Sequence, residues 1–185
     1  MTDPLSAQDR DLLARAAELQ RPLARAAKIA HTNGSGYVVF GGLTLFVALF
    51  GPDYVALLLG VAVTGVGIVE RRAGARLRDG DPAAPARLAV NELCLLGAIG
   101  VYAVLKLTLM RPDNEDIYKQ VGDALPGIDV KSATESIVTA FYGLMIAIAV
   151  GYQGGLAIYF SRRKEAVARF NSEVPQWARK VLKTL

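Results

Sequence analysis

The apolar residues of this chain fall into four long stretches with almost no charge, separated by short charged segments. The stretches 29–52, 54–69 and 136–161 contain no Asp, Glu, Lys or Arg, and only Lys106 interrupts 93–110. In a soluble protein, a helix of this length carries a polar stripe because one of its faces meets water. These stretches are apolar on all faces, and about 20 helical residues cross the hydrocarbon core of a bilayer. The pattern therefore predicts membrane-spanning helices.

The predicted fold is an all-α, polytopic helical bundle with about four transmembrane helices and an amphipathic helix at each end. The four spans are expected at 36–51, 54–69, 88–110 and 137–160, within a membrane domain of residues 36–160. The first two spans are short and are joined by Gly51, Pro52 and Asp53, so they either both cross the bilayer or form a re-entrant hairpin. Two full crossings are favoured, because unpaired backbone groups at a buried turn are costly in lipid.

Both terminal segments have a helical pattern of their own. Residues 1–35 are expected to form an amphipathic helix over 5–30, started by a capping box at Ser6 and Asp9. Pro22 is expected to kink or split this helix, and 31–36 to form a flexible link into the first span. The basic tail, 161–185, is expected to continue the last span and to restart as a helix at Pro175. These helices either lie in the headgroup layer or pack on protein.

The positive charges alternate with the spans. The N-terminal segment and the second connection carry five Lys or Arg each and the tail carries seven, whereas the outer loop, 111–136, carries three together with six acidic residues. Basic loops stay in the cytoplasm, so a multi-pass protein of the cell (inner) membrane is expected, with both termini cytoplasmic. The net charge of +4 is therefore a topology signal. It does not indicate nucleic-acid binding, because no basic face is interleaved with aromatic residues.

Small residues recur at every fourth position on two of the predicted spans. They are Gly143, Ala147, Gly151 and Gly155 on the fourth span, and Ala56, Gly60 and Thr64 on the second. Small residues at this spacing let helix backbones approach closely in lipid. Either they pack helices within one subunit, or they form contacts in an oligomer or around a pore.

Polar residues at membrane depth are the main functional candidates, because such groups are costly there and are generally functional. Asn91 and Glu92 in the third span, and Thr139 and Gln153 in the fourth, are the candidates for an ion or proton path. The alternative is a structural role, in which Glu92 pairs with an arginine such as Arg87. In the same alternative Thr139 bonds to its own helix, and Lys106 in the third span extends towards the outer headgroups.

No residue pattern indicates catalysis, a metal or a cofactor. The acidic cluster Asp113, Glu115 and Asp116 lacks the glycine-centred spacing of a calcium loop. His31 has no cysteine or second histidine beside it, which argues against zinc. The single cysteine, Cys94, can form no intrachain disulfide. We therefore expect neither an enzyme nor a bound cofactor.

Three segments resemble the MotA/TolQ/ExbB proton-channel family. The second span ends in the sequence Ile-Val-Glu-Arg-Arg at 68–72, the third contains Leu-Leu-Gly-Ala-Ile-Gly at 95–100, and the fourth reads Ile-Val-Thr-Ala-Phe-Tyr-Gly-Leu at 137–144. The resemblance implies a ring of subunits around a partner's helices, in which Thr139 lines an ion path. The chain departs from the family at Ala98, where the family has a second threonine, and in lacking its large cytoplasmic domain.

Two functions follow from these patterns. The first is an oligomeric transport or energy-transducing subunit that resembles the proton-channel components of membrane motors. The second is a non-catalytic structural or accessory subunit of a larger membrane complex. In both cases the expected partners are the lipid bilayer and other protein subunits, either copies of this chain or members of a complex.

Overall fold

The structure is a computed structural model, and it describes residues 6–51, 53–108 and 129–184. These residues form α-helices and no β-strand, in the order α1 (Ala7–Ala48), α2 (Tyr54–Arg78), α3 (Ala84–Thr108), α5 (Val130–Ser161), α6 (Arg163–Glu173) and α7 (Gln176–Thr184). The prediction of an all-α fold is confirmed. The expected outer loop, 111–136, is described only from residue 129, where it already forms the first turns of α5.

Three helices of the described chain are long and apolar enough to cross a membrane. They are α2, α3 and the helical segment Val130–Glu173, which contains α5 and α6. The span expected at 36–51 is not among them, because it forms only the last turns of α1. The apolar part of α1, from Tyr37 to Ala48, is about 18 Å long at 1.5 Å per residue. This is shorter than the hydrocarbon core of about 30 Å.

The first helix is longer and more continuous than the sequence pattern predicts. Ser6 and Asp9 form the expected capping box, but the helix neither stops at Pro22 nor loosens over 31–36. Gly34 explains why the expected link is helical: a Cβ built on it would lie 2.7 Å from the carbonyl oxygen of Gly67 in α2. The absence of side chains lets the two backbones touch, and this contact offsets the low helix propensity of glycine.

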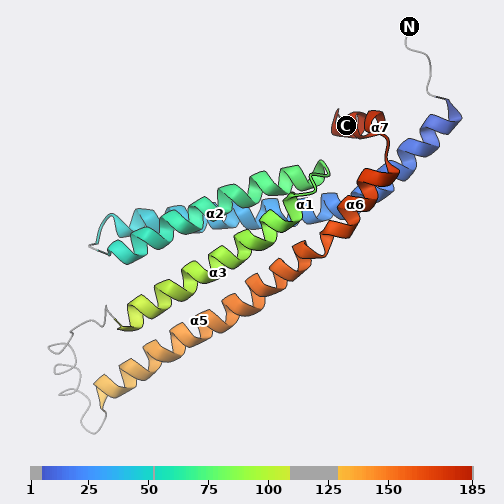
Figure 1. Cartoon of the computed structure of the whole chain (residues 1–185). Coiled ribbons are helices and arrows are strands. Elements are labelled where there is room, and N and C mark those ends of the chain that lie inside the picture. Colours follow the sequence, from blue (N-terminus) through green and yellow to red (C-terminus); the bar gives the residue numbers. More distant parts are fainter. Residues whose placement is uncertain (1–5, 52, 109–128, 185) are drawn as a thin grey trace.

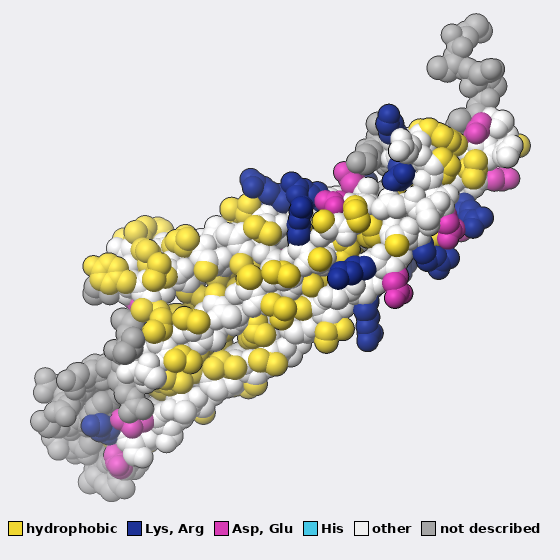
Figure 2. Space-filling model, in the orientation of Figure 1, with side chains coloured by type: hydrophobic (Ala, Val, Ile, Leu, Met, Phe, Trp, Pro, Cys, Tyr) yellow, Lys and Arg dark blue, Asp and Glu magenta, His cyan; other side chains and the backbone are white. Residues whose placement is uncertain are grey.

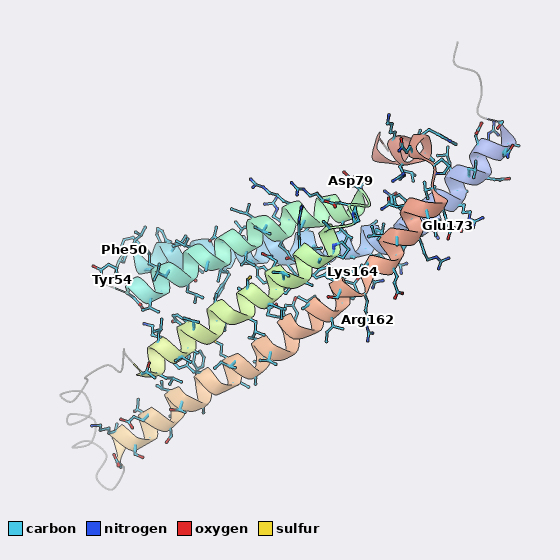
Figure 3. The ribbon with its side chains drawn as sticks, in the orientation of Figure 1. Phe50, Tyr54, Asp79, Arg162, Lys164 and Glu173 are labelled. Atoms are coloured by element: carbon cyan, nitrogen blue, oxygen red, sulfur yellow. The ribbon has the colours of Figure 1, made fainter. Side chains whose placement is uncertain are left out.

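The long helices form two antiparallel pairs, α1 with α2 and α3 with α5, which are joined where α2 packs against α3. The pairs meet at the end of the molecule where α6 and α7 lie and diverge towards the opposite end, where Phe50 and Tyr54 mark the α1–α2 turn (Figures 1 and 3). We call the end with α6 and α7 the basic end. Lys and Arg side chains gather there, whereas apolar side chains cover the middle of the visible face and a few charged ones lie at the opposite end (Figure 2).

The hydrophobic core lies at the basic end. Its largest fully buried side chains include Phe160, Phe170, Leu23, Leu77 and Leu88, which come from five different helices. The terminal helices therefore pack on protein of the same chain, and α7 does so through Ala178 and Leu182 while Trp177 stays partly exposed. Towards the opposite end the helices have little protein around them, and only 6% of the most apolar window of α5 is buried.

Candidate functional site

Five polar side chains from the four long helices meet between those helices. They are Tyr37 of α1, Glu70 of α2, Asn91 and Glu92 of α3, and Gln153 of α5. We call this group the carboxyl cluster. Glu70, Asn91, Glu92 and Gln153 are the buried polar side chains of the described chain, and both glutamates are 0% exposed. All four buried polar residues of the described chain therefore belong to this cluster.

The turn between α2 and α3 explains why the two glutamates meet. Glu70 and Glu92 each lie eleven residues from Asp81, so an antiparallel pair of helices places them at the same level. Gly80 makes the reversal with a φ of +79°, a conformation that glycine adopts without strain. The Asp81 carboxylate accepts a hydrogen bond from the amide of Ala83 at 2.8 Å, and Asn171 of α6 donates to the Gly80 carbonyl at 2.8 Å.

Hydrogen bonds tie the cluster to all four helices. The Asn91 Nδ2 group lies 2.7 Å from Glu70 Oε2 and 3.1 Å from the carbonyl oxygen of Val66, and it donates to both. The Tyr37 hydroxyl lies 3.3 Å from Glu92 Oε2 and 3.1 Å from Gln153 Oε1. A hydroxyl has one proton to donate, so Tyr37 donates to Glu92 or to Gln153 at any one time.

The two carboxyl groups face each other without a compensating cation. Glu70 Oε1 and Glu92 Oε1 are buried and accept no hydrogen bond, and the two residues lie at the same level of neighbouring antiparallel helices. None of the ion pairs in the described chain includes either residue. Two adjacent, desolvated carboxylates repel strongly, and an unpaired buried charge is costly. One proton placed between the two oxygens relieves both costs.

Arginine does not neutralise Glu92. Arg87 pairs instead with Asp81 at 3.8 Å, so the expected pairing of Glu92 with Arg87 is wrong. The five steps along the chain from Arg87 to Glu92 turn the helix by about 140° beyond a full turn, which places the two side chains on different faces of α3. Arg71 and Arg72 follow Glu70 directly and are exposed.

Of the four residues expected in an ion path, three lie together. Asn91, Glu92 and Gln153 belong to the carboxyl cluster, whereas Thr139 is exposed on α5. Thr139 precedes Gln153 by fourteen residues, which is about 21 Å along a helix. Lys106 is ion-paired with Asp53 at the α1–α2 turn, so it is held by a protein carboxylate instead of extending freely to headgroups.

The sequence analysis missed Glu70 and Tyr37 as members of the cluster. Glu70 ends an uncharged stretch and precedes two arginines, so it was assigned to the connection between the spans. Glu70 and Glu92 lie equally far from the turn between α2 and α3, and this symmetry is the sequence feature that indicates their contact. Tyr37 had no signal, because its role depends on how α1 packs against α3 and α5.

The two small-residue stripes have opposite environments. On α2, Gly60 packs against Leu45, and Thr64 packs against Gly41, whose built Cβ would lie 2.5 Å from Thr64 Oγ1. On α5, Gly143, Gly151 and Gly155 have no atom within 4 Å of a built Cβ, and Ala147 is exposed. The α2 stripe therefore packs within the subunit, whereas the α5 stripe faces outward.

Within the part of the chain that the structure describes, no three His, Cys, Asp or Glu side chains gather in a way that holds a metal ion. The carboxyl cluster supplies two carboxyl groups, two side-chain amides and one phenol, and a proton is the simplest ligand for the two carboxyl oxygens that lack a donor. No protein-family model, curated protein or solved structure matches this chain.

Proposed function

We propose that this chain is an integral membrane subunit that takes up and releases a proton at the Glu70–Glu92 pair, as part of an oligomeric transport or energy-transducing assembly. The observation that supports the proposal is the pair itself: two fully buried carboxyl groups, each with one oxygen that accepts no hydrogen bond. Ionisable groups inside membrane proteins are costly and mark ion pathways and proton relays.

Polar groups lead from the cluster towards the basic end. Asn33 lies one helical turn before Tyr37 on α1 and accepts a hydrogen bond of 3.1 Å from the Tyr152 hydroxyl of α5. The Asn33 amide nitrogen is buried and has no acceptor. Tyr152 is exposed and directly precedes Gln153 of the cluster, so these polar groups lie between the cluster and the surface. We propose that protons reach the pair along them.

The distribution of charge supports an orientation. The basic end holds the terminal helices and the arginine-rich turn between α2 and α3. Basic segments next to membrane spans stay in the cytoplasm. We therefore place the basic end, and with it the proton entry, on the cytoplasmic side.

The resemblance to the MotA/TolQ/ExbB family adds a proposal about assembly. Thr139 lies at the same helical spacing as the outward-facing small residues of α5. If subunits assemble through this face, Thr139 belongs to the contact between subunits. The carboxyl cluster, by contrast, is complete within one subunit. Variants of the cluster and variants of the α5 contact therefore test proton binding and assembly separately.

An accessory role in a larger complex is the second candidate. The observation in its favour is the α5 face, which is apolar, lined by small residues and without protein contacts in the subunit. In this case the carboxyl cluster holds the four helices together and exchanges no proton as part of the function.

Proton flux into liposomes that contain the purified chain tests the first proposal. Glu70→Gln and Glu92→Gln remove the titrating group and keep the shape, so each variant should reduce the flux to that of empty liposomes. Thr108→Val is the matched control, because its exposed hydroxyl bonds to the Val104 carbonyl of its own helix, about 24 Å along α3 from Glu92, and it should leave the flux unchanged.

Infrared difference spectroscopy between high and low pH separates a proton-binding pair from a structural one. The wild type should show the carbonyl band of a protonated carboxylic acid, and the two glutamine variants should lose it. Variants that fold, conduct like the wild type and keep this band would contradict the proposal and favour the accessory role.

A further inference from the structure

A half-open cavity of about 540 Å³ lies between α1 and α2 at the basic end. Its polar lining consists of Gln20, Lys28 and His31 from α1 and Arg78 and Asp79 from α2, and alanines from both helices complete the wall. The label on Asp79 in Figure 3 marks its position at the end of α2. The carboxyl cluster contributes no residue to this cavity, so it is a separate feature.

Two cationic side chains and one acidic side chain lie in the lining of the cavity, and the rest of the lining is neutral. Neither Lys28 nor Arg78 takes part in an ion pair of the described chain. Gln20 donates a hydrogen bond of 3.3 Å to the Arg78 carbonyl, which ties the two walls together. One turn closer to the membrane, the stem of the Arg71 side chain lies against Gly34. The acid in the lining, Asp79, directly follows Arg78 and has an interaction of its own.

The backbone around the cavity lies just beyond the lipid headgroups, and its long basic side chains reach back to them. His31 lies six residues before the apolar part of α1, which is about 9 Å along the helix. Arg78 lies nine residues after the apolar part of α2, which is about 14 Å along the helix. The headgroup layer is about 5–8 Å thick on each side of the hydrocarbon core. The Cα–Cβ bond of Arg78 is tilted towards the start of α2, that is, towards the membrane, and long basic side chains reach across such distances.

We propose that this cavity binds the phosphate of an anionic lipid headgroup from the adjoining leaflet. Lys28 and Arg78 supply the positive charge, and the His31 ring and the Gln20 amide supply further hydrogen-bond donors. The alanine wall and the open side suit a headgroup whose acyl chains run along α1 and α2 into the bilayer. This makes the site different from a closed pocket for a soluble phosphate.

The test counts the lipids retained by the full chain. The protein is placed in mixed phosphatidylglycerol and phosphatidylcholine bilayers, extracted in mild detergent, and weighed by native mass spectrometry. The wild type should retain phosphatidylglycerol in preference to phosphatidylcholine. Lys28→Gln combined with Arg78→Gln should weaken that preference by at least about five-fold, the factor expected for one lost charge at a membrane surface.

Arg162→Gln combined with Lys164→Gln is the matched control. It removes two positive charges at the same end of the molecule, at exposed positions away from the cavity (Figure 3). The control should retain phosphatidylglycerol like the wild type. An equal loss in both double variants would overturn the proposal in favour of general surface charge. Glycerol phosphate that displaces the lipid at equal concentration would overturn it in favour of a soluble ligand.

Thermal unfolding in the two lipids shows whether the cavity variant is folded and whether it still responds to phosphatidylglycerol. Phosphatidylglycerol should raise the Tm of the wild type and of the control, because a ligand that binds only the folded state stabilises it. The cavity variant should keep its Tm in phosphatidylcholine and lose most of the rise. A rise of the same size in the cavity variant would contradict the site.

Discussion

At the scale of single residues, the charged groups of the membrane region are held in two ways. Glu70 and Glu92 are buried together without a cation, whereas Asp53 and Lys106 neutralise one another near the opposite end. The first arrangement is the proton site proposed above, and the second is a structural ion pair. The two therefore lie in the same subunit and should respond differently to acid.

The Asp53–Lys106 pair predicts a pH dependence of stability. Partial burial acts to raise the pKa of Asp53, but the Lys106 ammonium and the amides of Ala56 and Val55 outweigh it and hold this pKa below its ordinary 3.8. The stabilisation is therefore complete above about 3.8 and is lost as the pH falls through the lowered pKa.

We expect Asp53→Asn to lower the free energy of unfolding at pH 7 by about 1 kcal/mol or less. The difference from the wild type should shrink as the pH falls below about 3.8, and Tm measured across this range checks it. A difference that stays constant into acid would show that the pair does not contribute through its charges.

At the scale of helices, the contact between α1 and α2 depends on glycine at particular positions. A Cβ on Gly41 would lie 2.7 Å from the backbone nitrogen of Thr64, and a Cβ on Gly67 would lie 2.6 Å from the carbonyl oxygen of Gly34. Backbone atoms cannot move aside as a flexible side chain does. Gly42 and Gly65, on the same two helices, have no atom within 4 Å.

Alanine substitution at these four glycines should therefore have opposite effects. Gly41→Ala and Gly67→Ala should each destabilise the α1–α2 pair by about 1–3 kcal/mol, the usual cost of overpacking. Gly42→Ala and Gly65→Ala should be neutral or stabilising by up to about 1 kcal/mol, because alanine favours helix. Thermal unfolding in one detergent measures all four, and equal effects at the two kinds of position would refute the close contact.

At the scale of the whole molecule, the helices are well packed at the basic end and diverge beyond it (Figure 1). The outward stripe of α5 has no neighbour in the subunit. If copies of the chain associate through this stripe, bulky side chains there should break the assembly without disturbing the subunit.

We expect Gly151→Leu combined with Gly143→Leu to reduce the mass of the detergent-solubilised particle, measured by light scattering. Gly97→Leu on α3 is the control, because this glycine also has open space around it and lies outside the stripe. An unchanged mass in the double variant would show that α5 is not the contact between subunits.

The local pattern of the chain determined the helices and their character. Ser6 and Asp9 identify the start of α1, the uncharged stretches identify α2, α3 and α5, and Pro175 precedes α7. Each of these features depends on residues a few positions apart, where capping and apolar periodicity act. The same reasoning failed at 31–36, because a glycine-rich segment reads as a flexible link unless the neighbouring backbone is known.

Only the tertiary structure decided which residues meet. Gln153 joins Glu70 and Glu92 while Thr139 stays exposed, and one small-residue stripe packs inward while the other faces out. These outcomes depend on how helices rotate and cross, which is set by the packing of residues far apart in the sequence. The carboxyl cluster is a product of that packing, because each of the four long helices contributes to it and no single one contains it.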